Sequence, residues 1–238
     1  MRRKQKLLRN ALVLLVGVAV YLLRDRLPEL EEAGLRPPGQ TNPAASSKPA
    51  SAASGAPPSA KGPFSGYESF PDARYVEHRG NDGDSFHVRA GGHEFELRLY
   101  FVDAPETYVS DRFPGQRRRV EEQARALGGL SVEQTLEVGK QATEFVRELV
   151  ANRPFTVHTY WEPVFDSDRR YVFVELSDGS DLAEQLVAAG LARIHTKGPG
   201  SRENPVPTPR GESFSQARRK LGILEREART AKRGAWGY

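Results

Sequence analysis

The feature that most constrains the fold is a pair of alternating segments joined by a tight turn. Apolar and polar side chains alternate over residues 85–90 and again over residues 93–102, which is the period of a strand with one buried face. Gly91 and Gly92 between the two segments are typical of a hairpin turn. Three more short segments have strand character: 73–80, 155–161 and 170–176. Five short strands favour a small closed barrel over a parallel sheet.

Three stretches outside the strands carry helix signals. A capping box at residues 131–134 opens a helix that runs to about residue 152. A second capping signal lies at residues 181–184, and Gly190 suits the end of that helix. Apolar residues at near-helical spacing over 213–232 indicate a third helix. These patterns predict an α+β domain with a five-stranded barrel and about three helices.

The chain divides into three regions. Between residues 37 and 62, 21 of 26 residues are Pro, Ala, Ser or Gly, so the large apolar side chains that could offset the entropy of ordering are almost absent. We therefore expect a disordered linker over residues 27–69. The folded domain then takes residues 70–238, and residues 1–26 form a separate hydrophobic segment.

Residues 1–26 have the pattern of a membrane anchor or a signal peptide, because basic residues precede the uncharged run 11–23. As a helix, that run spans roughly 20 Å, short of a bilayer core of about 30 Å, and it reaches farther if it begins at Leu7. Residues 21–26 are mostly large or charged, so the small residues of a cleavage site are missing. We expect an uncleaved single-pass anchor in the cell membrane, with a cytoplasmic N-terminus and the domain outside. Cleavage would instead give a secreted protein.

The charge balance and the cysteine content limit the classes of function. A net charge of +4 and a sequence pI of about 9.4 favour a polyanionic partner, although they also fit an anionic membrane surface or no partner. The chain has no cysteine. Disulfides, thiol nucleophiles and thiolate zinc sites are therefore excluded.

Acidic side chains gather at two turns next to predicted strands. Asp82-Gly83-Asp84 lies in the turn between the first two strands, and Asp103 and Glu106 follow the third strand directly. An intervening proline stiffens the spacing of the last two acids. Carboxylates and main-chain carbonyls are hard oxygen ligands, which suit Ca²⁺ or Mg²⁺ and not zinc. The two turns are therefore candidate halves of one metal site.

Two arginines accompany the acids: Arg98 lies five residues before Asp103, and Arg170 starts the last strand. A guanidinium matches phosphate oxygens in a bidentate fork and stays charged at any working pH. A metal, a carboxylate that can act as a base and two arginines are the minimal parts for attack of water on a phosphodiester. Each motif alone is ordinary turn or strand chemistry, so the interpretation depends on their joint order and spacing.

The run from Asp82-Gly-Asp-Ser85 through Arg98-Leu-Tyr-Phe-Val-Asp-Ala-Pro-Glu106 resembles the signature of the staphylococcal nuclease (thermonuclease) family. Gly190-Leu-Ala192 and the ending Lys232-Arg-Gly-Ala-Trp-Gly237 are also similar to that family. The likeness covers roughly residues 74–237, with one long insertion at about 107–138. It implies an OB-type barrel with Ca²⁺-dependent endonuclease or exonuclease activity on DNA and RNA that leaves a 3′ phosphate. Mg²⁺ or another divalent ion is the alternative to Ca²⁺.

The resemblance also implies a role for each matched residue. It places the metal ligands at Asp84, Asp103 and the backbone carbonyl of Ala104, with Asp82 in the outer shell. Glu106 corresponds to the general base, or to the residue that orients the attacking water. Arg98 and Arg170 correspond to the two phosphate-binding arginines of the catalytic site.

The sequence departs from the family's pattern at four places, of which the mildest is Ala104, where the family has threonine. Arg169 stands where the family often has glycine, so either Arg169 or Arg170 is the functional arginine, and the offset to the Asp-Gly turn after the strand favours Arg170. The family's nucleotide-contacting tyrosines are not matched at residues 195–197. The insertion carries three arginines at 117–119 and a helical run over 120–127. A contact with a phosphate backbone, a lid beside the site and a solvated basic face are alternative interpretations of that arginine run.

Three hypotheses of function follow. The first is an active nuclease that cuts DNA and/or RNA, with a monomeric catalytic domain, contact with the membrane through the N-terminal segment and no obligate protein partner. The second is a catalytically inactive OB-type module that binds nucleic acid on the cell envelope. The third is an envelope interaction protein, which predicts no salt-dependent affinity for polynucleotides. All the matched acidic and arginine positions are occupied by competent residues, which favours the first hypothesis.

Overall fold

The structure, a computed structural model, describes residues 66–238 apart from residues 111–113, 196 and 202. The expected anchor over 1–26 and most of the expected linker over 27–69 lie outside the described residues. Within the described part of the chain, no helix is long and apolar enough to cross a membrane.

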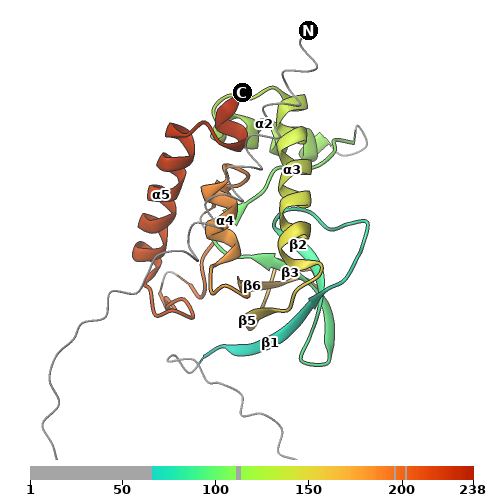
Figure 1. Cartoon of the computed structure of the whole chain (residues 1–238), viewed down its shortest axis with the longest axis vertical. Helices are drawn as coiled ribbons and strands as arrows, with labels where there is room; N and C mark the ends of the chain where they lie inside the picture. Colours follow the sequence, from blue (N-terminus) through green and yellow to red (C-terminus); the bar gives the residue numbers. More distant parts are fainter. Residues whose placement is uncertain (1–65, 111–113, 196, 202) are drawn as a thin grey trace, which may run out of the picture. The chain divides into compact units, whose positions relative to one another are not determined.

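Five strands close into a barrel in the order β1-β2-β3-β6-β5, which confirms the predicted barrel (Figure 1). The strands are β1 Glu68–Tyr75, β2 Ser85–Ala90, β3 His93–Leu99, β5 Phe155–Pro163 and β6 Arg170–Glu175. β3 and β6 run parallel, and the other neighbouring pairs are antiparallel. This is a closed, mixed barrel of the OB type within an α+β fold.

The barrel is filled by the apolar side chains of the alternating segments. Phe86 and Val88 of β2 and Leu97 and Leu99 of β3 are buried. Each such side chain stabilises the fold by about 1.5–3 kcal/mol relative to full exposure. The face predicted from the alternation is therefore the face that packs inside.

The first strand lies earlier in the sequence than expected. β1 pairs with β5 from Glu68 onward, and the Phe70 ring meets the Trp161 ring edge to face. Residues 76–84, which the local pattern assigned in part to this strand, form the turn that carries the first acidic pair. The partner strand sets where β1 begins, so the folded domain starts before residue 70.

The alternation predicted over residues 93–102 breaks before its end. β3 ends at Leu99, and Phe101 has a left-handed backbone conformation with a φ of 66°, which is unusual for a bulky residue. The chain then leaves the barrel and forms a two-stranded sheet from β4 (Val102–Asp103) and β7 (Arg193–Ile194). The second acidic turn therefore begins on β4, in a sheet separate from the barrel.

The polar side chains at the end of the third strand are buried. Arg98 and Tyr100 are only 8% and 1% exposed. The Tyr100 ring stacks on the Tyr171 ring, and its hydroxyl donates to Glu162 at 2.6 Å. Alternation predicts the direction in which a side chain leaves the strand, but it does not predict which distant segments cover that side chain.

In the part of the chain that the structure describes, four helices and a short 3₁₀ turn accompany the barrel. They are α2 Pro114–Ala126, α3 Val132–Val150, α4 Leu182–Ala188, α5 Phe214–Thr230 and the 3₁₀ turn Gly234–Gly237. Capping boxes at Ser131 and Ser213 and the capping side chain of Asp181 confirm the three predicted helix starts. α2 is the additional helix, and it extends the helical run that the sequence indicated within the insertion.

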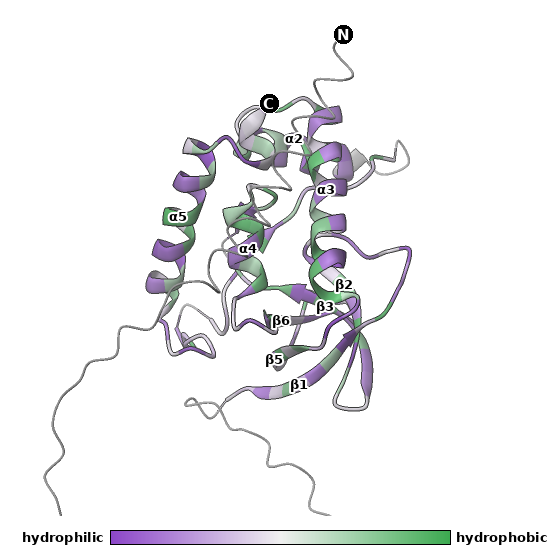
Figure 2. Cartoon of the chain, in the orientation of Figure 1, coloured by the Kyte–Doolittle hydropathy of each residue, from purple (hydrophilic) through white to green (hydrophobic). Residues whose placement is uncertain are grey.

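The helices lie together on one side of the barrel, with α4 between α3 and α5 (Figure 1). Apolar and polar residues alternate around α3 and α5, so each helix has an apolar stripe (Figure 2). In α3 the buried stripe includes Val138, Ala142, Val146 and Val150. This stripe belongs to the same core as the barrel side chains, and it fixes α3 next to the strand ends.

Candidate active site

The two acidic turns pack against the same helix, α3. A Cβ added to Gly83 would lie 2.6 Å from the Cβ of Ala142 in α3 and 2.9 Å from the Cβ of Ala104. A Cβ added to Gly139, one turn earlier in α3, would lie 2.3 Å from the carbonyl oxygen of Glu106. Both positions need glycine, because a Cβ at Gly83 would overlap two alanine Cβ atoms and a Cβ at Gly139 would overlap main-chain atoms. α3 therefore brings the two turns together.

A single guanidinium joins the two acidic turns. Arg98 Nη1 lies 3.0 Å from Asp84 Oδ1, and Arg98 Nη2 donates to Asp103 Oδ1 at 2.7 Å. Nη1 also donates to Ser85 Oγ at 3.4 Å. The side chains of Arg98, Asp84 and Asp103 are 10%, 1% and 3% exposed. The arginine and the two aspartates that the sequence singled out thus form one buried cluster.

Burial and charge act on this cluster in opposite directions. Burial lowers the pKa of the Arg98 guanidinium, but the charges of Asp84 and Asp103 outweigh it, so the net pKa is raised. Burial likewise raises the pKa of the Asp103 carboxyl, but neighbouring arginines, first Arg98 and then Arg119, outweigh it and the net pKa is lowered. Asp103 is therefore ionised at neutral pH, as a metal ligand must be.

Asp103 accepts hydrogen bonds from four side chains: Arg98 at 2.7 Å, Arg119 at 3.0 Å, Gln123 at 2.9 Å and Arg193 at 2.8 Å. These donors come from three segments, namely β3, the inserted helix α2, and β7, which pairs with β4. Donors from separate segments hold the carboxylate in one orientation.

Asp82 and Asp84 differ in their surroundings although they share one turn. Asp82 Oδ1 accepts the main-chain N–H groups of Asp84 at 3.0 Å and Ser85 at 2.7 Å, as in an Asx turn. Burial, followed by the charge of Asp84, raises the pKa of Asp82 well above its ordinary value. Asp84 Oδ2 instead accepts the N–H of Ala104 at 2.7 Å. Asp82 therefore shapes its own turn, whereas Asp84 reaches across to the second turn.

Glu106 lies at the edge of the cluster. Its side chain is 20% exposed, and its Oε1 lies 3.1 Å from Arg119 Nε. Its main-chain N–H donates to Gln123 Oε1 at 3.1 Å. The candidate base is thus fixed through its backbone, while its carboxylate remains partly accessible to solvent.

Arg170 is not brought into this cluster. It begins β6 beside Leu97 of β3, and its Nη1 donates to the main-chain carbonyls of Ser167 at 3.2 Å and Arg169 at 2.9 Å. Among the described residues, no ion pair joins Arg170 to an acid of either turn. The phosphate-binding role of Arg170, and the choice between it and Arg169, stay predictions.

Three residues of the cluster were not singled out as site residues by the sequence: Arg119, Gln123 and Arg193. Arg119 belongs to the basic run of the insertion, and Gln123 follows it by four residues on the same helix face. Arg193 comes directly after the Gly-Leu-Ala motif. Helical spacing could have linked the first two residues, but no local pattern shows that their helix folds back over the acidic turns.

The oxygen atoms gathered here are of the kind that a hard cation takes. Asp84, Asp103 and the carbonyl of Ala104 supply carboxylate and carbonyl oxygens, which suit Ca²⁺ in chemical type. Among the described residues, however, no group of three or more His, Asp or Glu side chains could hold a metal ion. A cation bound by these two aspartates would therefore complete its coordination shell with water or substrate oxygens.

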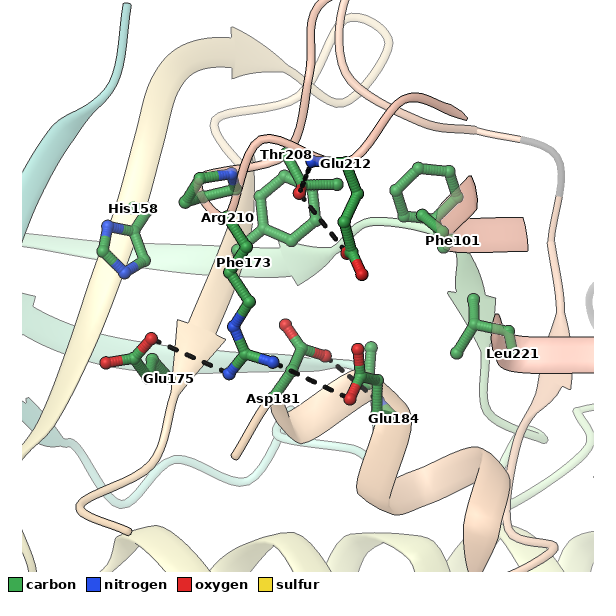
Figure 3. A pocket seen from close by; sticks show the side chains of 13 residues that line it. Phe101, His158, Phe173, Glu175, Asp181, Glu184, Thr208, Arg210, Glu212 and Leu221 are labelled. Carbon is green, nitrogen blue, oxygen red and sulfur yellow. Dashed lines mark hydrogen bonds and ion pairs between the residues drawn. The ribbon is translucent and has the colours of Figure 1, made fainter. Parts of the chain in front are cut away.

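A separate hollow lies between β5, β6, α4 and the segment 208–212 (Figure 3). Arg210 extends into it between Glu175 and Glu184, at 3.7 Å and 3.8 Å. Asp181 also faces it, and its pKa is raised to about 6, chiefly by burial. The side chains of the two acidic turns do not line this hollow, so it is distinct from the candidate active site.

Comparison with known proteins identifies the family. The sequence model described as Staphylococcal nuclease homologue (SNase) matches residues 96–238, more than half of the chain. No curated protein matches the chain. The matched residues include Arg98, Asp103, Glu106 and Arg170, and the ion pair with Arg98 ties the preceding Asp84 to them. The barrel and the family match agree, and the chain belongs to the staphylococcal nuclease homologue family.

Proposed function

We propose that this protein is a metal-dependent nuclease that hydrolyses phosphodiester bonds of DNA and/or RNA. The observation that carries the proposal is that the Arg98 guanidinium contacts both Asp84, at 3.0 Å, and Asp103, at 2.7 Å. Asp103 precedes Glu106 by three residues. The proposal is supported by a family that consists generally of nucleases. Acids, an arginine and a partly accessible carboxylate at the end of rigid strands are the parts that water attack on a phosphodiester requires.

Ca²⁺ is the proposed cofactor, because the oxygens of Asp84, Asp103 and the Ala104 carbonyl fit a hard divalent cation. When bound, such an ion supplies Lewis-acid stabilisation of the charge on the phosphate. Asp82 is the proposed outer-shell carboxylate, and its Oδ1 shapes the turn by accepting two main-chain N–H groups. Mg²⁺ is the alternative ion to compare.

The remaining steps, proton transfer and phosphate binding, are assigned to residues of the chain itself. Glu106 accepts a proton from the attacking water or orients it, and its partial exposure leaves the carboxylate reachable. Arg98 holds the two aspartates in register and offers positive charge to the phosphate. Arg170, on the neighbouring strand, would have to turn from its main-chain partners to reach a phosphate.

A second candidate function is binding of nucleic acid without cleavage. The observation that favours it is the set of three arginines already paired with Asp103. Two of them, Arg119 and Arg193, have side chains that are 41% and 20% exposed, so their guanidinium groups can meet an anion even without a cation. The intact acidic positions favour cleavage over this alternative.

The test is a digestion assay with the full-length chain on single-stranded and double-stranded DNA and RNA, with Ca²⁺, with Mg²⁺ and with chelator. A truncated chain must keep β1, which begins at Glu68. Cleavage that needs a divalent ion and stops with chelator supports the nuclease. Binding without cleavage in Ca²⁺ supports the second candidate. A chain that shows no binding and no cleavage under any of these conditions would refute both candidate functions.

The location of the protein in the cell is also a proposal. We propose that residues 1–26 keep it at the cell membrane with the nuclease domain outside, on the basis of the basic start and the apolar run. Protease added to intact cells should then remove the domain, and fractionation should recover the full-length chain with membranes. Recovery of a shortened chain from the medium would instead show cleavage and secretion.

A further inference from the structure

The inserted helix α2 places an arginine directly against the acidic turns. Arg119 Nη2 donates to Asp103 Oδ1 at 3.0 Å, and Arg119 Nε lies 3.1 Å from Glu106 Oε1. One guanidinium therefore lies between a proposed metal ligand and the proposed base. We propose that Arg119 binds the phosphate backbone of the nucleic-acid strand at this site, and this inference rests on the proposed function.

Gln123 fixes the position of that arginine. It is fully buried, and its Nε2 donates to Asp103 Oδ2 at 2.9 Å and to the Ala104 carbonyl at 3.1 Å. Its Oε1 accepts the N–H of Glu106 at 3.1 Å. Residues four apart share one face of a helix, so these bonds hold Arg119 over the same turn. Gln123 is a positioning residue for the arginine.

Arg119 differs from Arg98 in the solvent exposure of its side chain. The Arg98 side chain is 10% exposed and is enclosed by Asp84, Asp103 and Ser85. The Arg119 side chain is 41% exposed, although it contacts two carboxylates. A guanidinium carries five N–H donors in a fixed fork, so Arg119 presents part of that fork to solvent beside Glu106. It is the more accessible of the two guanidinium groups.

A phosphate can take the place of a carboxylate partner at this position. Carboxylate and phosphate oxygens both match the guanidinium fork in a bidentate way. Arg119 can therefore exchange a carboxylate oxygen for a phosphate oxygen while the bonds of Gln123 keep α2 in place. Arg170, by contrast, is held by main-chain carbonyls in its own hairpin. The second phosphate contact close to Glu106 thus comes from the insertion.

The experiment measures binding of a fluorescein-labelled single-stranded oligothymidine by anisotropy. The full-length chain is titrated in chelator over a series of salt concentrations, so that nothing is cleaved. The slope of log K against log salt is negative, and loss of one phosphate contact reduces its magnitude by about 0.7 for a single strand. We expect Arg119→Ala to show that change and to bind about tenfold or more weakly. Arg119→Lys should keep the slope but bind more weakly, because the fork is lost.

Arg125→Ala is the matched control. Arg125 lies in the last turn of α2, is exposed, and its loss changes the net charge by the same amount. It should leave the slope nearly unchanged. Thermal unfolding of each variant shows whether the fold is kept. If Arg119→Ala unfolds, the affinity of Arg119→Lys carries the test: weaker binding supports the inference, and binding as tight as that of the native chain overturns it.

The outcomes separate this inference from the proposed function. A salt slope that is smaller in magnitude in Arg119→Ala and unchanged in Arg125→Ala supports the inference. An unchanged slope in Arg119→Ala, with wild-type cleavage intact, would overturn the inference and leave the nuclease standing. Faster cleavage or tighter Ca²⁺ binding by Arg119→Ala would also overturn it, because the arginine would then be blocking the cation. A wild-type chain that neither binds nor cuts would refute the proposed function itself.

Discussion

Replacing Arg98 with methionine should destabilise the fold strongly, because it leaves two buried carboxylates without their shared partner. Asp103 would keep Arg119 and Arg193 as ion-pair partners. Asp84 would keep only hydrogen bonds, from Ser85 Oγ and the Ala104 N–H. Removing one partner of a buried ion pair costs about 3–5 kcal/mol. We expect a loss in that range at pH 7 for Arg98→Met, most of it due to Asp84.

The pH dependence gives the sign of the effect. In the native protein the pKa of Asp103 is lowered, so its stabilising contribution is present above its ordinary pKa and is lost as the pH falls through the lowered value. Without Arg98 that pKa rises, and protonation then relieves the buried charge. The deficit of Arg98→Met relative to the native chain should therefore be smaller at pH 2 than at pH 7, because the contribution of Asp103 is lost only below its ordinary pKa of about 4. Adding Asp84→Asn should recover part of the deficit at pH 7.

Urea denaturation followed by circular dichroism at both pH values measures these differences. The control is Arg89→Met on β2, where Arg89 pairs with Glu94 at 2.8 Å but the two side chains are 68% and 50% exposed. An exposed pair contributes about 0–1 kcal/mol, so that variant should be nearly native. If Arg98→Met cost no more than Arg89→Met, or if its deficit were equal at pH 2 and pH 7, the buried-charge argument would be wrong.

Three further predictions test separate parts of the molecule. Glu106→Gln should lower the cleavage rate about 10²–10⁴-fold and keep oligonucleotide binding in chelator, whereas full activity would exclude Glu106 as the base. Asp181→Asn should be more stable than the native chain at pH 8 by about 1–3 kcal/mol and equal to it near pH 4 (Figure 3). Because the pKa of Asp181 is raised to about 6, native stability falls as the pH rises from about 4 through 6, whereas asparagine keeps the helix cap without a charge. Parallel pH profiles of the two proteins in urea denaturation would contradict this prediction. Gly139→Ala should cost about 1–3 kcal/mol and reduce cleavage, because its Cβ would meet a main-chain oxygen at 2.3 Å. Gly222→Ala in α5, with the nearest atom at 3.6 Å, should instead stabilise the helix by up to about 1 kcal/mol, and equal effects in thermal unfolding would refute the packing argument.

Local patterns predicted most of the barrel because each strand has one face inside. The alternation in Ser85–Ala90 placed Phe86 and Val88 correctly in the core. The capping signals at Ser131 and Asp181 likewise gave the correct helix starts, because a cap satisfies donors of its own first turn. Signals of this kind depend on neighbours in sequence, and they succeeded for that reason.

Features set by distant segments were not predicted. The first strand begins where β5 pairs with it, at Glu68, and no local pattern marks that position. The role of Gln123 in the site was not predicted for a similar reason, since a glutamine within a charged helix is ordinarily a surface residue. Its burial comes from three polar partners in the second acidic turn. Only the folded chain shows that the insertion covers this turn.

Burial decides which substitutions can separate chemistry from folding at this site. Arg98, at 10% exposure, holds two buried carboxylates, so a change there disturbs the fold and the site together. Glu106 and Arg119, at 20% and 41%, lie at the edge where water and a phosphate can reach them. Asp103 would keep partners on β3 and β7 if Arg119 were lost. Activity lost at Glu106 or Arg119 with unfolding unchanged would therefore report on the reaction itself, whereas activity lost at Arg98 alone would not.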